Sequence, residues 1–544
     1  MKKSRMFTVI VLLLLLLVAV SVQAQSLRKG TVTVKVLVEG AAMHGTNGVT
    51  VNDQGLLYIA SAVGQEIVVM DPHNGKILER FGPDSGVVGP DDVVFGPDGS
   101  LYWTDIMSGE VGRRTPEGHV KKQYVDDFVN PLAFNEEGRL FVAQAFVGDA
   151  LYEVDPELSD PPVKILGTGN PMYHLNGFAF GPDGWLYAPR QQLEQIVRIN
   201  VDTAEVEIIT DDFEGSCAFD SHGNLYAAAD DRVYQIDPES GAYTTVVALP
   251  AGGADNLAFD ADDTMYVTNF RDGTVYSILP NGRPRVISPG GLMAPGGIAV
   301  LPDQHAGESV YIADFWTMRG YDGRNGQPGS SGRNFFFDSP FSASADGQNL
   351  ILTSWFGNTV EVWNPDEDLV QEMYVANVPI DAVRFQGDFA VSELGSGSVV
   401  KLEAGSGIST PIVSGLYVPA GLAAKGSDLW VADWASGIVW QIAANGAVLD
   451  PPAVIASGLV QPEGLAVDHD GSLLVVESGV GRVSRIDPHT GEVSLVAEGL
   501  ALGAPGPDGW PPTWLLNDVT VGKNGDIYVT GDIANVVYRL RERP

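Results

Sequence analysis

The chain has 544 residues, with 69 acidic and 32 basic side chains and a formal charge of −37. This length exceeds a single ordinary core, so it predicts two domains or an array of repeats. The strong negative charge repels nucleic-acid backbones and argues against DNA or RNA as a partner.

The N-terminus has the three regions of a secretory signal peptide. Three basic side chains precede position 6, residues 9–20 are apolar, and residues 22–24 form a small-residue cleavage site. We therefore expect residues 1–24 to be removed by a bacterial Sec-type pathway, which makes the protein secreted or periplasmic. A membrane anchor is the alternative, but the apolar run is short for a span. No other segment is as apolar, so no membrane contact is expected after cleavage.

A pattern of strand, turn and strand then recurs to the C-terminus. Residues 462–478, PEGLAVDHDGSLLVVES, show it clearly, with two apolar strands on either side of an Asp-Gly turn. Twelve copies begin near residues 46, 90, 130, 175, 215, 254, 295, 340, 380, 419, 462 and 516. A period of about 40 residues with four strands per copy is typical of β-propeller blades. We predict an all-β fold of twelve four-stranded blades, arranged as two six-bladed propellers.

The two ends of the chain indicate how a propeller closes. Repeat twelve stops after its third strand, residues 536–540, and residues 31–40 form an isolated alternating strand. Pairing these two strands leaves no open sheet edge. Repeats twelve and one are then expected to be neighbours in one ring.

This closure predicts a discontinuous first propeller, formed by residues 25–212 and 458–544. Residues 213–457 would form the second propeller as an insertion. The alternative is simple succession, with residues 31–290 followed by 291–544, and it allows one strand to be exchanged between rings.

Three local features complete the survey of the chain. Residues 318–334 are rich in Gly, Arg and Asn and predict a long loop. Residues 500–514 carry two Trp and predict a lid or the rim of a channel mouth. Cys217 lies in an apolar pattern and is expected to be a small core residue, because a lone cysteine can form no intramolecular disulfide.

In a propeller the first strand of each blade lines the central channel, and the residue before that strand points into one mouth. Oxygen-bearing side chains at these positions converge on the axis and suit a hard cation such as Ca²⁺. Repeats eleven, twelve and one to four carry better donors than the others, so we expect them to form the functional ring. The better donors are Glu463, Asn517, Asp518, Asn47, Asp91, Asp92, Asn130 and Asn176, and the poorer positions are Ser216, Asn256, Gly297, Ser342, Asp381 and Gly421.

These contexts resemble those of the NHL-type and SMP-30/gluconolactonase-like propellers, with features of paraoxonase-like metal strands. The resemblance rests on a Glu before a first strand in PEGLAV and on Asn or Asp in contexts such as LNGFAF and LNDVTVG. It implies a divalent-cation site, with Ca²⁺ as the expected ion. The metal ligands it implies are Glu463, Asn517, Asn47, Asp92 and Asn176.

The resemblance also implies a secreted, cation-dependent hydrolase of the lactone or ester type acting on a small molecule. In that family an acid or a histidine activates water, and His44, His174 and Asp92 are the candidates here. One alternative is a non-catalytic protein that binds a glycan, a peptide or a protein, and another is a metal-assisted lyase that resembles streptogramin lyase. Asn or Asp before Gly can also simply cap a turn.

Overall fold

The protein is described by a computed structural model that covers residues 27–29, 32–146, 148–167, 172–279, 281–303, 307–334 and 338–542. The predicted signal peptide, residues 1–24, lies outside the described residues. The described residues form twelve antiparallel sheets, eleven of four strands and one of five, which confirms the predicted fold class. None of the helices in the described ranges is long and apolar enough to span a membrane.

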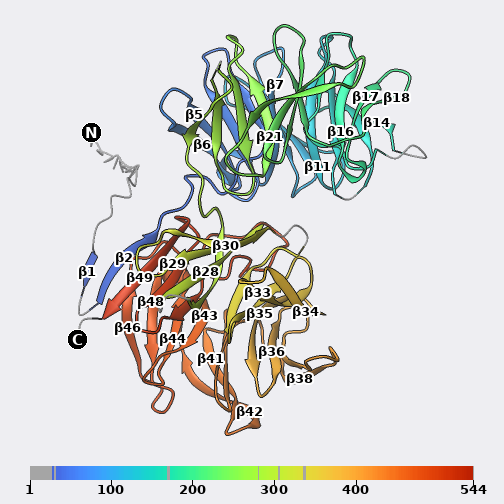
Figure 1. Cartoon of the computed structure of the whole chain (residues 1–544). Helices are drawn as coiled ribbons and strands as arrows, with labels where there is room; N and C mark the ends of the chain where they lie inside the picture. The colour runs from blue at the N-terminus through green and yellow to red at the C-terminus, as the bar shows by residue number, and fades with distance from the viewer. Residues whose placement is uncertain are drawn as a thin grey trace, which may run out of the picture.

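The first six sheets follow one another in chain order, and together they form ring A (residues 49–288; Figure 1). Their strands are β3 (Val49–Val51), β4 (Leu57–Ser61), β5 (Glu66–Asp71) and β6 (Lys76–Phe81); β7 (Pro90–Phe95), β8 (Leu101–Asp105), β9 (Glu110–Arg114) and β10 (Val120–Tyr124); β11 (Val129–Phe134), β12 (Leu140–Gln144), β13 (Leu151–Val154) and β14 (Val163–Leu166); β15 (Ala179–Phe180), β16 (Leu186–Arg190), β17 (Gln195–Asn200) and β18 (Glu205–Thr210); β19 (Ser216–Phe219), β20 (Leu225–Ala229), β21 (Arg232–Ile236) and β22 (Tyr243–Ala248); and β23 (Ala254–Phe259), β24 (Met265–Asn269), β25 (Val275–Ile278) and β26 (Pro284–Ser288). Two 3₁₀ turns, η1 (Pro83–Ser85) and η2 (Gln191–Leu193), lie in its loops.

The other six sheets form ring B, which consists of residues 295–542 together with the N-terminal strands. Its strands are β27 (Pro295–Pro302), β28 (Glu308–Asp314), β29 (Thr317–Asp322) and β30 (Pro328–Asn334); β31 (Ser342–Asp346), β32 (Asn349–Ser354), β33 (Thr359–Asn364) and β34 (Leu369–Val375); β35 (Pro379–Phe385), β36 (Asp388–Glu393), β37 (Ser398–Leu402) and β38 (Ser409–Ser414); β39 (Pro419–Lys425), β40 (Asp428–Asp433), β41 (Ile438–Ala444) and β42 (Ala447–Ser457); β43 (Pro462–Val467), β44 (Leu473–Glu477), β45 (Arg482–Ile486) and β46 (Val493–Glu498); and β47 (Val519–Val521), β48 (Ile527–Gly531) and β49 (Val536–Glu542) with β2 (Val32–Val38) and β1 (Leu27–Lys29). The 3₁₀ turn η3 (Ser478–Val480) follows β44.

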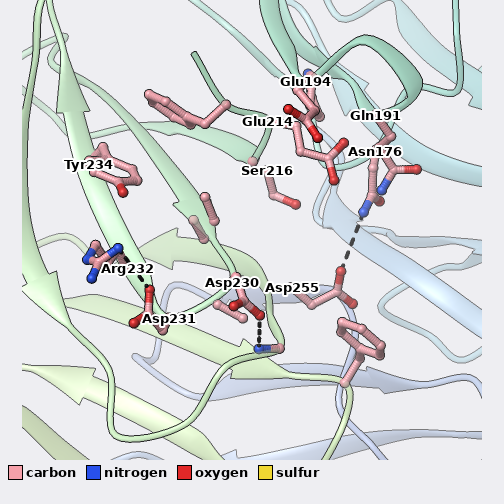
Figure 2. A pocket seen from close by; sticks show the side chains of 18 of the residues that line it. Asn176, Gln191, Glu194, Glu214, Ser216, Asp230, Asp231, Arg232, Tyr234 and Asp255 are labelled. Atoms are coloured by element: carbon pink, nitrogen blue, oxygen red, sulfur yellow. Dashed lines mark hydrogen bonds and ion pairs between the residues drawn. The ribbon is translucent and has the colours of Figure 1, made fainter. Parts of the chain in front are cut away.

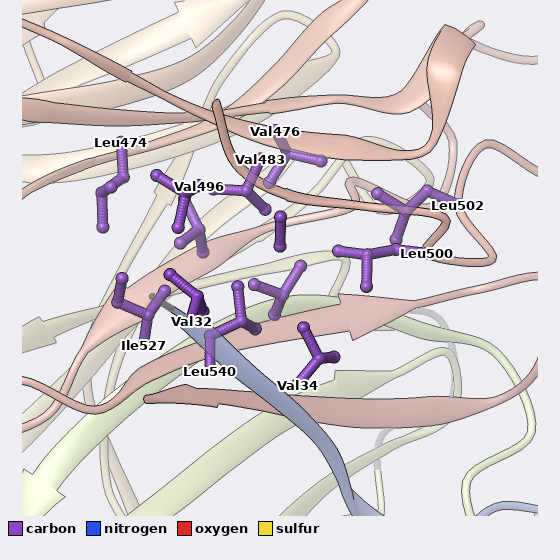
Figure 3. Close-up of a cluster of buried hydrophobic side chains, with 13 residues drawn as sticks. Val32, Val34, Leu474, Val476, Val483, Val496, Leu500, Leu502, Ile527 and Leu540 are labelled. Carbon is purple, nitrogen blue, oxygen red and sulfur yellow. The ribbon is translucent and has the colours of Figure 1, made fainter. Parts of the chain in front are cut away.

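The N-terminal strand closes ring B, as the sequence predicts. β2 pairs antiparallel with β49, with Val34 opposite Leu540. Figure 1 shows the two strands side by side although they come from opposite ends of the chain. Val32 and Val34 also pack into a buried cluster with Leu474 and Ile527 (Figure 3), so the strand contributes core as well as hydrogen bonds.

The predicted division of the blades between the rings is wrong. β3 of the first blade packs against β23 of the sixth, and Tyr266 shares a buried cluster with Leu57 across that junction. In ring B, β27 packs against β47 and β48, and Ile298 shares a cluster with Tyr528. Residues 25–212 therefore do not share a ring with residues 458–544. The alternative of simple succession assigns the twelve blades to the two rings as the structure has them. The N-terminal strand is exchanged into the second ring.

The chain enters ring A and leaves it through two neighbouring segments. After β2 it crosses to ring A, completes six blades and returns, and the backbone N–H of Ala41 donates to the carbonyl of Leu292 at 2.7 Å where the two crossings meet. The pairing of β2 with β49 shows that the N-terminal strand and the last blade share a ring. It does not show which ring contains the first blade, so the crossing after β2 could not be predicted from it.

The predicted loop at residues 318–334 is also wrong, because these residues form most of β29 and β30. Arg319 in β29 is charged, but it points into the junction of the rings. Its Nε donates to the carboxylate of Asp314, and its Nη2 donates to the carbonyl of Arg271 in ring A at 2.6 Å. The arginine in residues 318–334 therefore serves a contact between the two rings and does not indicate a flexible loop.

The prediction for Cys217 agrees with its position in the structure. Its side chain is buried with Tyr187 and Leu225 in the cluster between blades four and five. Burial raises the pKa of the thiol, which keeps it protonated and unreactive.

Candidate functional site

The central channel of ring A is lined by polar side chains that β-bulges turn out of the regular strand pattern. The bulge at the start of β7 spans Asp91 and Asp92, that of β11 spans Asn130, and that of β23 spans Asp255 and Asn256. A bulge places an extra residue opposite the partner strand and re-aims the local side chains. These three first strands therefore begin at the channel mouth with polar residues.

Asp255 is the residue on which three blades converge. Nδ2 of Asn47 donates to Oδ2 of Asp255 at 3.1 Å, and Nδ2 of Asn176 lies 3.5 Å from Oδ1 of Asp255. Figure 2 shows the contact between Asn176 and Asp255 at the bottom of a pocket. Burial raises the pKa of Asp255 to about 6, because a carboxylate loses hydration there.

Asp91 is the second carboxylate of this group. It is only 7% exposed, and its carboxylate accepts no hydrogen bond from the described residues. Burial, and then the charges of Asp255 and Asp92, raise its pKa well above the usual value. In the neighbouring blade, Oδ1 of Asn130 is buried without a partner within the described part of the chain. Buried acceptors without donors are costly, so these oxygens are available to a ligand.

Carboxylate and amide oxygens are the ligands that a hard cation takes, and this group of side chains carries both. In the structure Nδ2 of each amide points to Asp255, while Oδ1 of Asn47 accepts the backbone N–H of Ala62 at 3.2 Å and Oδ1 of Asn176 accepts that of Gly177 at 3.0 Å. Binding of a cation would therefore require both amides to rotate so that Oδ1 replaces Nδ2. Across the described ranges, no three His, Cys, Asp or Glu side chains are placed to hold a metal ion, so amide oxygens would have to complete the site. A bound cation would offset the loss of hydration that raises the pKa of both carboxylates, and also the repulsion between Asp91 and its acidic neighbours.

Above this floor lies a pocket of about 580 Å³ between blades three and six of ring A. Figure 2 shows Glu194 and Glu214 side by side on one wall, with Ser216 between them and Asp255. Aromatic and charged side chains form the rest of the rim, namely Phe146, Phe213, Tyr234, Phe270, Asp212, Asp230, Asp231, Arg232 and Arg271. A space of this size accommodates a small organic molecule.

His174, a candidate base in the sequence, lines this pocket together with Asn176. Its Nε2 lies 3.1 Å from Nε2 of Gln192, and its backbone is left-handed with a φ of 59°. Burial lowers the pKa of its imidazole, so the ring is neutral at neutral pH and can accept a proton.

His44, the other predicted base, does not line the pocket. It lies on the crossing from ring B to ring A, and its Nε2 is 2.8 Å from the carbonyl oxygen of Asp532 in ring B. Burial lowers its pKa, which keeps the ring neutral. The contact links the two rings and places His44 outside the lining of the pocket that contains His174.

Asp92 joins blades together. Its Oδ1 accepts hydrogen bonds from the backbone N–H of Val93 at 2.9 Å and from Nδ2 of Asn256 at 3.0 Å, and its Oδ2 accepts one from the N–H of Leu132 at 3.2 Å. Both oxygens are therefore engaged, although burial raises the pKa of Asp92 to about 7. Neither oxygen of Asp92 is therefore free for a ligand, whereas the carboxylate of its neighbour Asp91 accepts no hydrogen bond from the described residues.

Glu463 and Asn517 lie in ring B and cannot share a site with Asn47 and Asn176. Oε2 of Glu463 accepts hydrogen bonds from the backbone N–H of Asn517 at 2.7 Å and from its Nδ2 at 3.0 Å. Nδ2 of Asn517 also donates to Asp532 at 3.0 Å. The predicted five-residue metal site is therefore wrong, because its members are divided between two channels.

Apolar side chains close the corresponding mouth of ring B. Trp355 Nε1 donates to the carbonyl of Trp514 at 2.9 Å, which holds the end of the insert of residues 500–514 against the blade of β32 and β33. The buried aliphatic and aromatic members of this cover are Val63, Met293, Ala294, Phe315, Phe341, Trp355, Ile380, Ala420, Trp514, Leu515 and Leu516. The polar pocket at this end of ring A is formed by repeats three to six, not by a ring of repeats eleven to four.

Two residues of this site were missed or undervalued in the sequence. The sequence pattern predicts Asn256 rather than Asp255 as the mouth residue of its blade, although the pair Asp255-Asn256 repeats the pattern of Asp91-Asp92. Glu214 lies outside the sequence pattern, because it stands two residues before Ser216, the mouth position of its blade. Asp255 could be predicted by aligning the repeats at their first strands. The position of Glu214 depends on the loop geometry around the pocket, which the repeat pattern does not give.

No protein-family model and no curated protein matches the chain. Among solved structures, virginiamycin B lyase from Staphylococcus aureus is 16% identical, with a TM-score of 0.37 over 52% of this chain and 96% of that one. A gluconolactonase from Xanthomonas campestris is 16% identical, with a TM-score of 0.37 over 45% and 88%. The extracellular domain of a candidate one component system from B. thetaiotaomicron is 11% identical, with a TM-score of 0.33 over 95% and 80%. Such distant likenesses carry no argument about activity.

Proposed function

We propose that ring A is the catalytic unit of an exported, divalent-cation-dependent hydrolase of the lactone or ester type. The observation that carries the proposal is the convergence of Asn47, Asn176 and Asp255 beneath a pocket, with the buried, unpaired carboxylate of Asp91 beside them. Ca²⁺ suits these ligands, because it accepts carboxylate and amide oxygens in flexible numbers.

The proposed reaction needs a polarised carbonyl, a base and a pocket that orients the substrate. When bound, the cation would polarise the substrate carbonyl as a Lewis acid. His174 is neutral and lines the same pocket, so it can take a proton from the attacking water. The pocket walls limit the substrate to a small molecule and restrict its orientation above Asp255.

The test compares Ca²⁺ binding and turnover in matched variants of the mature protein. Asp91→Asn and Asp255→Asn should each abolish the rise in melting temperature with Ca²⁺ and lower lactone hydrolysis at least a hundredfold. His174→Ala should keep the Ca²⁺ shift but lose most of the turnover. Glu463→Gln is the control and should keep both.

Other outcomes separate the alternatives. Purified protein without a bound divalent ion, and without a Ca²⁺ shift, would overturn the proposal. A Ca²⁺ shift without turnover across lactones and esters would favour the non-catalytic binding protein. Cleavage without uptake of oxygen from labelled water would favour the lyase.

A further inference from the structure

One wall of the ring A pocket carries more negative charge than the proposed hydrolysis requires. The lining contains two arginines, and each is already paired. Arg271 Nη1 contacts Oδ1 of Asp230 at 2.8 Å, and Arg232 Nη1 lies 3.4 Å from Oδ1 of Asp231. The carboxylates that face the pocket without a cationic partner in the described residues include Asp212, Glu194, Glu214 and Asp255.

Glu194 and Glu214 lie on this wall and are not among the proposed cation ligands. Oε2 of Glu214 is buried and has no hydrogen-bond partner within the described ranges. Burial, and then the charge of Glu194, raise the pKa of Glu214 to about 7. Two carboxylates held this close without a counter-charge favour a positively charged ligand between them.

Ser216 gives independent support for a ligand at this wall. Its side chain is only 4% exposed and lines the pocket, yet its hydroxyl has no partner in the described part of the chain. Figure 2 shows the hydroxyl turned toward the space between Glu214 and Asp255. Because the hydroxyl opens only onto the pocket, its lone pairs are available to a donor of a ligand bound there.

We propose that Glu194, Glu214 and Ser216 form a binding site for an organic ammonium group, so that ring A takes an amine-bearing small molecule. An ammonium offers three N–H donors, which match two carboxylates and one hydroxyl. Tyr234 and Phe213, whose ring centroids are 4.5 Å apart, supply apolar surface for the carbon chain of the ligand. The site stands whether or not the floor of the pocket carries a divalent cation.

An organic cation fits this wall better than a second metal ion. In the described ranges no third His, Cys, Asp or Glu joins the two carboxylates in a metal-binding arrangement. The pocket volume of about 580 Å³ also exceeds what a hydrated ion needs and suits a molecule. Anionic ligands are excluded, because both arginines are already neutralised.

The test measures binding of three probes of equal length to the mature protein by calorimetry. Hexylamine should bind at least tenfold more tightly than hexan-1-ol, which corresponds to a difference in binding free energy of about 1.4 kcal/mol. Hexanoate should not bind. Equal affinity for hexylamine and hexan-1-ol, or tighter binding of hexanoate, would overturn the ammonium site.

Variants locate the site. Glu194→Gln and Glu214→Gln should each weaken hexylamine binding at least tenfold, and Ser216→Ala should weaken it a few-fold. Glu205→Gln, an exposed change on β18, should leave the affinity unaltered. Unchanged binding in both wall variants, with folding verified by their melting temperatures, would place the amine elsewhere and refute the proposal.

Asp91→Asn separates this inference from the proposed hydrolase. The variant should lose the Ca²⁺ shift and keep hexylamine binding. If the unmodified protein shows the Ca²⁺ shift but does not prefer hexylamine, the ammonium site alone is refuted. If it binds hexylamine but shows no Ca²⁺ shift, the cation-dependent hydrolase alone is refuted.

Discussion

Asp91 and Asp92 show how one residue position changes the role of a carboxylate. Both begin the same blade, but the bulge of β7 turns Asp91 toward Asp255 and directs Asp92 to backbone N–H groups and to Asn256. Asp518 and Asp381 in ring B repeat the second role, because each accepts backbone N–H groups from its own blade and from the adjacent one. A carboxylate with both oxygens engaged serves the fold, and one without partners remains for a ligand.

Glu463 gives a residue-scale prediction about pH. Burial, and then the charge of Asp532, raise the pKa of Glu463 from its ordinary 4.5 to about 8. The folded protein therefore holds this proton more tightly than the unfolded chain, and the stability it contributes is full below pH 4.5 and lost as the pH rises to about 8. Glu463→Gln should raise the free energy of unfolding at pH 8 by about 4 kcal/mol, and with it the melting temperature, and should change both little at pH 4.5.

A pH series of melting curves checks this prediction, with Asp470→Asn as an exposed control in the same blade. A melting temperature that falls at pH 8 in Glu463→Gln would show that the carboxylate stabilises the fold. Loss of the Ca²⁺ shift in the same variant would return Glu463 to the role of a metal ligand.

At the scale of the element, β2 is the strand on which ring B depends. It supplies the outer strand of the last blade through a ladder with β49, and its valines fill the core next to blade eleven. Without it, β49 would present an open edge and part of this core would be exposed to water.

Deleting residues 27–38 should therefore lower the melting temperature of ring B and leave that of ring A nearly unchanged. Calorimetry with and without Ca²⁺ distinguishes the two transitions, since the proposed site lies in ring A. Deleting residues 27–29 alone is the matched control, because β1 pairs only with β2. A selective loss of ring A would contradict the assignment of blades to rings.

At the scale of the whole molecule, the rings meet through a small number of buried contacts. Arg319 bonds Asp314 and the carbonyl of Arg271, and Asp314 also accepts the backbone N–H groups of Met293 and Ala294 on the return crossing. Phe270, which lines the ring A pocket, packs edge-on against Trp316 of ring B at 5.9 Å. Ring B therefore supports one side of the pocket entrance.

Arg319→Leu should uncouple the two rings without unfolding either. The variant leaves the buried Asp314 without its charged partner and removes the bond to ring A, which costs about 3 kcal/mol or more at the junction. We expect two resolved unfolding transitions in calorimetry and faster proteolysis of the crossings, with Ca²⁺ raising only one transition. Arg324→Leu, an exposed change in the same blade, is the control. A single unshifted transition in Arg319→Leu would show that other contacts hold the rings together.

The sequence by itself determined the blades. Each blade is a local object, in which alternating apolar residues and Gly-containing turns set strand, face and hairpin, so the count of twelve and the closing role of the N-terminal strand could be predicted. The candidate donors in the mouths, such as Asn47 and Asn176, were also visible, because they occupy a fixed place in the repeat.

Only the tertiary structure decided which donors meet. Blades that look alike in sequence can pack in either ring, and the chain leaves ring B directly after β2, so Glu463 and Asn47 lie in different channels. The choice of Asp91 over Asp92 follows from a bulge, and the importance of Asp255 follows from amides in two other blades. These are contacts between residues distant in the chain, and no local pattern encodes them.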